Sequence, residues 1–472
     1  MPSRAVCQRV ARGRGPWQHG WPMMPDPATG MLPGETPAPA VPHPSGPLPT
    51  RLLPDSAGVS AEGRLTLAGV DVVELADEVG TPVFVYDEEH LRARCREARE
   101  AFGSRVAYAS KAFLCKAMAR LAYEEGCCID VATGGEMAVA LAAGVPAERL
   151  VLHGNNKSVE EIEAAVSAGV GRIVVDSFGE IDRLASLHAG GAAGAALPSV
   201  LVRVTPGIEA HTHEYVMTGQ DDSKFGFGLA SGAAAEAVER LTRPGSGARL
   251  VGIHAHIGSQ IFALESFDRE LSVLGPFFAG LGLEELCVGG GLGVAYVGGE
   301  EAPTISQWAG AVRQAARAAG IGDHIVLSAE PGRAVAAAAA LTCYRVGTVK
   351  ELPGLRTYVS VDGGMSDNPR PVLYGSGYEA FLPREVLAQR PRTVTVVGKH
   401  CESGDLLVRD AAVPSDLAVG DILATPVTGA YGHSMASNYN KVPRPPVVFV
   451  ADGAWRVVVR RETYADLMAL DQ

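Results

Sequence analysis

The stretch from Val106 to Ala132, VAYASKAFLCKAMARLAYEEGCCIDVA, decides the fold of this chain. It opens on the short apolar run VAYAS at Val106–Ser110 and closes on a second one, CIDVA at Cys128–Ala132. Between the two runs, Leu114–Glu125 has the composition and apolar spacing of a helix. A strand, a helix and a second strand in immediate succession predict a βαβ unit with parallel strands.

Runs of the same kind recur along the chain as far as Ala329. They are LVLH at Leu150–His153, RIVVD at Arg172–Asp176, VLVRV at Val200–Val204, LVGIHAH at Leu250–His256, LCVG at Leu286–Gly289 and IVLSA at Ile325–Ala329. Helix-like segments lie between several of them, at Glu136–Ala143, Ser158–Ala168 and Ala233–Leu241. Eight strands alternating with helices predict an α/β fold, a closed (β/α)8 barrel of the TIM type.

Polar residues stand at or near the carboxyl end of each run. They are Lys111, Asp130, His153, Asp176, Arg203, His256, Gly289–Gly291 and Glu330. In a barrel of parallel strands these ends meet at one rim, and that rim carries the chemistry. The sequence therefore predicts one site, built from residues far apart along the chain.

A different pattern follows Arg333. The β-type runs there have no helices between them, and they are Thr342–Val349, Thr357–Val361, Thr393–Val397, Asp405–Val408, Asp421–Thr425, Val447–Val450 and Trp455–Arg460. The last two flank Asp452-Gly453, a dipeptide typical of hairpin turns. We expect the barrel over residues 87–335 and a β-sandwich or β-barrel-like domain over 336–472. The strand PVFVY at Pro82–Tyr86 leads us to expect that residues 51–86 pair with that second domain.

The first 50 residues differ from the rest in composition. Of the 31 prolines, 13 lie before residue 55, so we expect residues 1–50 to be a disordered, Pro-rich extension. The net charge of −12 argues against nucleic acid or a membrane as partner, since both favour basic surfaces. The eight cysteines form no CxxC pair and no Cys/His metal spacing, which predicts a cytoplasmic protein with free thiols and no metal site.

Two motifs at the rim have both a chemical and an ordinary structural explanation. Lys111 ends YASK, where partial desolvation would lower its pKa and suit it for Schiff-base chemistry; the alternative is a solvated lysine at a helix start. Gly289-Gly290-Gly291-Leu292-Gly293 follows the seventh run, where barrels often bind phosphate; the alternative is a plain tight turn.

The other two rim motifs are also ambiguous when taken singly. In HAHIGSQ, His254 and His256 share a strand face and could bind zinc, or His256 could face a flat cofactor with Ser259 near a phosphate. In EPGR, the Glu330 carboxylate could pair with a protonated ring nitrogen or form an ion pair with Arg333.

Six motifs in a fixed order remove much of this ambiguity. They are YASK at 108–111, HIGSQ at 256–260, GGGLG at 289–293, EPGR at 330–333, CESGD at 401–405 and GAYGHSMASNYN at 429–440. From about residue 52 to 465 the chain resembles the diaminopimelate decarboxylases, which are fold-type III pyridoxal-phosphate enzymes. The resemblance implies a barrel that binds pyridoxal 5′-phosphate, a β domain, a homodimer with shared active sites, and conversion of meso-2,6-diaminopimelate to L-lysine and CO2.

The resemblance also implies a role for each matching residue. Lys111, His256 and Cys401 would be catalytic: Lys111 would carry the cofactor, His256 would stack on its ring and Cys401 would donate a proton from the other subunit. Further cofactor contacts would come from Asp130, Arg203, Ser259, Gly289, Gly290, Gly291, Glu330, Pro331, Gly332, Arg333 and Tyr431. Substrate would be held by Arg333, Arg370, Tyr374, Tyr431 and Glu402, the last also from the other subunit.

Three rival functions remain open at this stage. One is a decarboxylase of another diamino acid, such as ornithine, arginine or carboxynorspermidine; the paired arginines, Arg333 and Arg370, favour a substrate with a distal carboxylate. Another is a metal-dependent hydrolase that uses His254 and His256. The third is a non-catalytic relative, against which the presence of Lys111 and Cys401 counts.

Overall fold

The computed structural model describes residues 46–191, 197–208 and 223–472. Most of the predicted extension, residues 1–45, lies outside the described residues. Within residues 46–50, Leu48 is buried, and Thr50 begins a short 3-10 helix, Thr50–Leu52.

Eight parallel strands form the predicted barrel. In spatial order they are β13 (Val326–Ser328), β12 (Glu285–Cys287), β11 (Arg249–Ala255), β9 (Ser199–Thr205), β8 (Arg172–Val175), β7 (Leu150–Leu152), β6 (Cys128–Val131) and β5 (Ala107–Ala109). The ends of this ladder meet, because the backbone N–H groups of Ala107 and Ala109 donate to the carbonyls of Ala329 and Pro331 at 3.0 and 3.2 Å. The prediction of a (β/α)8 barrel is confirmed.

The barrel interior begins with a layer of small and medium apolar side chains that is separate from the main core. Its members come one from each of seven strands: Ala107, Cys128, Val151, Val174, Leu201, Val251 and Cys287. Because strand side chains alternate between faces, the residue two positions further along also points inward. This rule brings Asp130, His153, Asp176 and Arg203 into one layer above the apolar one, at the carboxyl ends of the strands.

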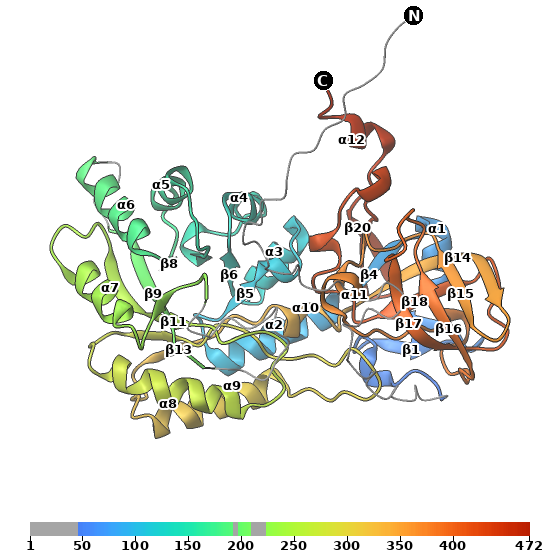
Figure 1. Cartoon of the computed structure of the whole chain (residues 1–472), viewed down its shortest axis with the longest axis horizontal. Coiled ribbons are helices and arrows are strands. Elements are labelled where there is room, and N and C mark those ends of the chain that lie inside the picture. Colours follow the sequence, from blue (N-terminus) through green and yellow to red (C-terminus); the bar gives the residue numbers. More distant parts are fainter. Residues whose placement is uncertain (1–45, 192–196, 209–222) are drawn as a thin grey trace, which may run out of the picture. The chain divides into compact units, whose positions relative to one another are not determined.

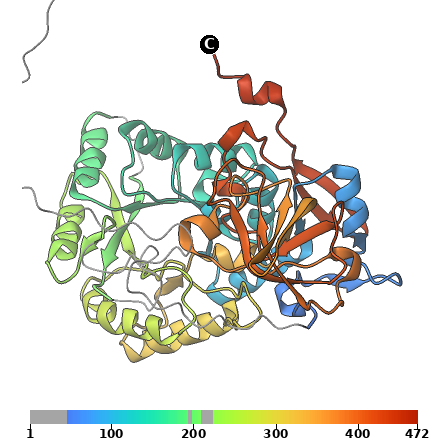
Figure 2. The same ribbon diagram turned by 45° about the vertical axis from the view of Figure 1, so that its right-hand side comes forward.

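Helices cover the outside of the barrel, as Figures 1 and 2 show. They are α2 (Glu88–Phe102), α3 (Lys116–Glu124), α4 (Gly134–Ala142), α5 (Val159–Ala168), α6 (Phe178–Ala189), α7 (Ala233–Thr242), α8 (Glu265–Ala279) and α9 (Ile305–Ala318). Side-chain caps define several of their starts. Ser158 and Thr304 form capping boxes at α5 and α9, and Asp87 accepts from the first backbone N–H groups of α2.

One buried carboxyl in α8 has a testable consequence. Both oxygens of Glu270 are buried without a hydrogen-bond partner among the described residues, and burial raises its pKa well above the usual value. The folded state therefore retains a proton that the unfolded chain releases above its ordinary pKa, so the destabilisation grows as pH rises. We expect Glu270→Met to raise the free energy of unfolding by about 1–3 kcal/mol at pH 8, and by less at pH 4.5, in urea titrations.

The control for this prediction is the same change on an exposed helix face. Glu163→Met in α5, where the side chain is exposed, should change the free energy of unfolding by less than about 0.5 kcal/mol at either pH. Equal stability of wild type and Glu270→Met at pH 8 would contradict the prediction.

The second sheet mixes strands from both ends of the described chain. Its order is β17 (Leu406–Val413), β16 (Arg392–Val397), β15 (Arg356–Val361), β14 (Ala340–Leu352), β4 (Val83–Asp87), β19 (Val447–Ala451) and β20 (Ala454–Val459), and β18 (Ile422–Pro426) also pairs with β14. β4 lies antiparallel to β14 and parallel to β19. The turn between β19 and β20 contains Asp452 and Gly453, both with positive φ, as a tight hairpin requires.

The remaining described strands and α-helices are short. They are β1 (Ala57–Val59), β2 (Leu65–Leu67), β3 (Val70–Asp71), α1 (Val72–Val79), β10 (Phe227–Gly228), α10 (Arg333–Ala336), α11 (Arg370–Tyr374) and α12 (Tyr464–Met468). Of the helices in the described ranges, none has the length and apolar character needed to cross a bilayer.

A loop of the second sheet lies against the barrel rim. The N–H of Tyr431 and the hydroxyl of Ser434 both donate to the carbonyl of Ala112, at 2.8 and 3.0 Å. At Gly429 a Cβ atom would stand 1.9 Å from the carbonyl oxygen of Ala336, so only glycine allows this approach. The loop therefore places Tyr431 beside the segment that carries Lys111.

Candidate active site

The barrel rim encloses a cavity of about 310 Å³. Its walls include twelve of the residues predicted for the site, namely Lys111, Asp130, Arg203, His256, Ser259, Gly290, Gly291, Glu330, Pro331, Gly332, Arg333 and Tyr431. They come from most of the barrel strands and from the second sheet, so the cavity exists only in the folded chain. Gly289, Arg370, Tyr374, Cys401 and Glu402 are not part of these walls.

Lys111 lies in the 3-10 turn Ser110–Ala112 that follows β5. Desolvation acts to lower its pKa, as expected from the sequence. Electrostatic interactions with Tyr431, Asp130 and Glu330 outweigh that effect, and the pKa of Lys111 is raised. The expectation of a lowered pKa was wrong, because it considered desolvation alone and not the acids that the barrel brings to the rim.

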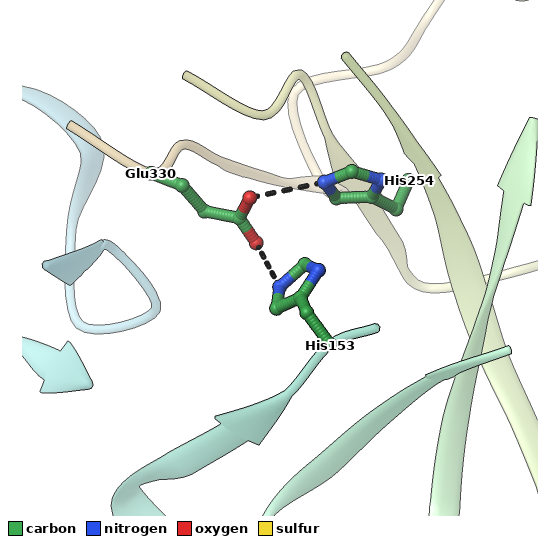
Figure 3. Close-up of side chains that lie close together, drawn as sticks. All are labelled: His153, His254 and Glu330. Atoms are coloured by element: carbon green, nitrogen blue, oxygen red, sulfur yellow. Dashed lines mark hydrogen bonds and ion pairs between the residues drawn. The ribbon is translucent and has the colours of Figure 1, made fainter. Parts of the chain in front are cut away.

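Glu330 is held by two histidines rather than by the nearby arginine (Figure 3). Its carboxylate oxygens Oε1 and Oε2 lie 2.8 Å from His153 Nε2 and 3.0 Å from His254 Nε2. Arg333 instead donates to Tyr296 Oη at 2.7 Å and to Ser259 Oγ at 2.9 Å. The alternative of a local Glu330–Arg333 ion pair is therefore not what the fold forms.

The buried acids and histidines of this group shift one another's pKa values. Desolvation acts to raise the pKa of Glu330, but the two histidines outweigh it and hold that pKa well below the usual range. Burial raises the pKa of Asp130 to about 6 and lowers that of His254 to about 4. For His153, desolvation is outweighed by Asp130 and Glu330, so its pKa is raised.

His256 and His254 have different partners. The N–H of Gly290 donates to His256 Nδ1 at 3.2 Å, and desolvation lowers the pKa of His256 well below its ordinary value. A neutral, flat imidazole therefore borders the cavity next to the glycine-rich turn. The alternative reading of His254 and His256 as a zinc pair is not supported, since the group of metal-type ligands found in the described residues is His153, His254 and Glu330.

Arg333 and Arg370 contact the same two tyrosines, Tyr296 and Tyr431. The Arg333 guanidinium lies 4.7 Å from the ring centre of Tyr431, and that of Arg370 lies 5.0 Å from the ring centre of Tyr296. Arg370 also donates to Tyr378 Oη at 3.0 Å and lies 5.8 Å from the ring centre of Tyr374. These contacts fix both guanidinium groups close to the cavity, where each retains donors for an anion.

The CESG segment, residues 401–404, is exposed, and Asp405 anchors it. Asp405 is buried and accepts from the N–H and the Nδ1 of His400, both at 2.8 Å, and from the N–H of Met365 at 2.7 Å. The Cys401 N–H donates to Asn440 Oδ1 at 3.0 Å. Cys401 and Glu402 are thus displayed on a well-held loop outside the walls of the cavity.

The cavity fits pyridoxal phosphate. Lys111 offers an amine for the cofactor's aldehyde, and Glu330 offers an ionised carboxylate for its ring nitrogen. His256 offers a flat imidazole. For the phosphate the cavity offers the Ser259 hydroxyl and the turn at Gly290–Gly291, which are donors of the kind that hold a phosphate. A Cβ on Gly290 would lie 2.4 Å from the Glu330 carbonyl oxygen, so the turn has no room for a side chain there.

Sequence reasoning omitted three residues that bear on the site. His153 and His254 were recognised only as a rim residue and as half of a zinc pair, and Tyr296 was not recognised at all. The alternation of inward-facing residues is a signal for His153, which follows Val151 by two positions. On β11 the register shift between Leu250 and Gly252 breaks this alternation and hides the signal for His254. For Tyr296 we see no sequence signal, because its role depends on where Arg333 points.

The chain is similar to known proteins over most of its length. Residues 88–337 match the family model of the pyridoxal-dependent decarboxylase, pyridoxal binding domain. A diaminopimelate decarboxylase of Mycobacterium tuberculosis (strain ATCC 25618 / H37Rv) is 48% identical over 87% of this chain and 95% of its own. That of Halalkalibacterium halodurans is 46% identical over 88% and 96%. The solved diaminopimelate decarboxylase from M. jannaschii in co-complex with L-lysine is 32% identical, covers 89% of this chain and 98% of its own, and superposes with a TM-score of 0.81.

Proposed function

This chain belongs to the diaminopimelate decarboxylases, a family of pyridoxal-dependent enzymes, and on that premise we propose how its own residues divide the work. The reaction is the decarboxylation of meso-2,6-diaminopimelate to L-lysine and CO2, the last step of lysine biosynthesis. Its cofactor is pyridoxal 5′-phosphate. The observation that carries the assignment of roles is the cavity, whose walls combine Lys111, Glu330, Arg203 and Arg333 with the phosphate donors.

The cofactor contributes an electron sink, because its ring delocalises the electron pair left on the α-carbon when CO2 departs. When the cofactor is bound, Lys111 would hold it through its amine and Glu330 would accept from the ring nitrogen. His256 would stack on the ring. Asp130 and Arg203 would support the lysine and the ring, and Ser259, Gly289–Gly291 and Tyr431 would hold the phosphate.

The substrate is held at its far end by charges of both signs. Arg333 and Arg370, with Tyr374, bind the distal carboxylate. Arg333 lines the cavity, and the Arg370 guanidinium lies next to this wall, 5.8 Å from the ring centre of Tyr431. Glu402 binds the distal ammonium. Cys401 donates its Sγ proton to the α-carbon. Ornithine lacks the distal carboxylate, so it would leave both buried guanidinium groups without an anion.

The position of Cys401 and Glu402 supports a shared active site. Both are exposed and lie outside the cavity walls of their own chain, on a loop that Asp405 holds in a defined shape. We propose a homodimer in which this loop completes the cavity of the other subunit, with the barrel over residues 87–335 and the β domain, joined by residues 51–86, over 336–472. The seven cysteines of the described residues are free thiols, which supports a cytoplasmic location.

A substrate panel tests the function. The purified protein, supplied with pyridoxal phosphate, should release CO2 from meso-diaminopimelate. We expect kcat/KM for ornithine, arginine and carboxynorspermidine to be at least about a thousandfold lower, because a site built for a charged group rejects substrates that lack it. CO2 release from ornithine at a comparable kcat/KM would contradict the proposed roles of Arg333 and Arg370.

A further inference from the structure

We propose that His153 and His254 are positioning residues for the cofactor, and that together they fix the Glu330 carboxylate in the orientation in which it accepts from the ring nitrogen. The inference rests on the role proposed above for Glu330 and adds two residues to it. Neither histidine is among those assigned a role in the reaction. Both act through Glu330 and not by contact with the reacting atoms.

His153 and His254, which we call the clamp, restrain the Glu330 carboxylate from two directions. His153 follows β7 and His254 lies in β11, and each directs Nε2 at a different oxygen of Glu330, which follows β13 (Figure 3). The imidazole rings are 5.0 Å apart at an angle of 68°. The terminal torsion of a glutamate is ordinarily broad, but one donor on each oxygen sets the plane of this carboxylate.

Burial makes these hydrogen bonds strong. The side chains of His153 and Glu330 are each 9% exposed and that of His254 is 1% exposed. An ionised carboxylate can only accept, so both Nε2 atoms carry a hydrogen. His254 Nδ1 has no hydrogen-bond partner within the described ranges, which fits a neutral ring whose single hydrogen is on Nε2.

The two histidines differ in charge. Burial lowers the pKa of His254 to about 4, so this ring orients Glu330 without adding charge. His153 Nε2 also lies 3.7 Å from Asp130 Oδ1, and Asp130 and Glu330 together raise its pKa in spite of desolvation. Each oxygen of Glu330 keeps a second acceptor position, so the clamp leaves room for the ring N–H.

The consequence is preorganisation. A carboxylate already oriented and ionised binds a cationic ring nitrogen without rearrangement, whereas a freed one must be reoriented first. Loss of either imidazole would also leave a buried anionic oxygen short of a donor. Cofactor affinity should therefore depend on both histidines, and that dependence should exist only while Glu330 is a carboxylate.

The test is a double-mutant cycle read by cofactor binding. Pyridoxal phosphate is removed and titrated back into wild type, His153→Leu, His254→Leu, Glu330→Gln and the double variant His254→Leu/Glu330→Gln, following the dissociation constant and the absorbance spectrum. Each Leu variant should bind at least about tenfold more weakly with an altered spectrum. In the Glu330→Gln background, the further effect of His254→Leu should fall below about twofold.

Conservative variants separate positioning from packing. His254→Gln, whose amide N–H reaches about as far as Nε2, should stay within about threefold of wild type. His254→Asn, whose amide falls short of Glu330, should lose as much cofactor affinity as His254→Leu. It replaces His254→Leu in the test if that variant does not fold. His324→Leu, at an exposed histidine, is the control and should bind like wild type.

Each contrary result has a distinct meaning. If the Leu and Asn variants bind the cofactor like wild type, or lose the same factor in the Glu330→Gln background, the clamp is wrong and the role of Glu330 stands. If Glu330→Gln itself leaves affinity and spectrum unchanged, the role proposed for Glu330 is wrong and the clamp falls with it.

Discussion

Lys111→Ala should abolish CO2 release from meso-diaminopimelate, with a loss of at least about 10⁴-fold in kcat, the scale seen when an enzyme loses its covalent residue. Lys111 lies in the turn after β5 and lines the cavity, where its amine is placed to bond the cofactor's aldehyde. The variant should still bind pyridoxal phosphate through Glu330 and the phosphate donors, but borohydride should no longer attach the cofactor to the protein. Mass spectrometry after borohydride treatment measures this directly.

The control for this prediction is a lysine a few residues away. Lys116 begins α3 and is exposed, so Lys116→Ala should keep the activity and the borohydride adduct of wild type. An adduct that persists on Lys111→Ala, at another lysine, would show that the cofactor is held elsewhere.

The barrel could be predicted from sequence because its signal is repeated. Each strand is a short apolar run, and each ends in a polar residue, so that an error at one run would not alter the fold assignment. The alternation of faces then follows from strand geometry, and it places Asp130 and Arg203 inward. One irregularity could not be foreseen: the register between β9 and β11 shifts between Leu250 and Gly252, which changes the spacing on β11 between Val251 and His254.

The hydrogen-bond partners of the site residues were harder to predict than the residues that line the cavity. EPGR places Glu330 and Arg333 three residues apart, a spacing that favours a local ion pair. The chain turns at Pro331–Gly332 and begins α10 at Arg333, so Glu330 stays with the strand layer while Arg333 turns to Tyr296 and Ser259. Which atoms meet across a barrel depends on tertiary packing, and local spacing carries little information about it.

The direction of the pKa shift at Lys111 was mispredicted for the same reason. Desolvation alone lowers the pKa of a lysine, and the sequence offers no other argument at Lys111. The fold brings Asp130 and Glu330 from distant strands to the same rim, together with Tyr431 from the second sheet, and their combined effect reverses the sign.

A mixture of Lys111→Ala and Cys401→Ala proteins should regain activity if two subunits share each active site. Cys401→Ala alone should lower kcat by about 10²–10⁴-fold, the range for loss of a positioned acid, and Lys111→Ala should be inactive. In a mixed dimer one cavity combines an intact Lys111 with an intact Cys401 from the partner, while the other cavity lacks both. Random exchange in an equal mixture makes half of the dimers mixed, so we expect about a quarter of wild-type activity under the two-fold symmetry of a dimer.

Pairs of variants from one side of the shared site provide the matched controls. Lys111→Ala with Glu330→Gln should recover nothing, because both defects lie in the barrel cavity and each cavity of a mixed dimer keeps one of them. Cys401→Ala with Glu402→Gln should also recover nothing, because both defects travel on the same exposed loop. Exchange of subunits is followed by native mass spectrometry. If mixed dimers form and Lys111→Ala with Cys401→Ala stays inactive, Cys401 serves the cavity of its own chain, and the loop that Asp405 anchors would have to move to reach it.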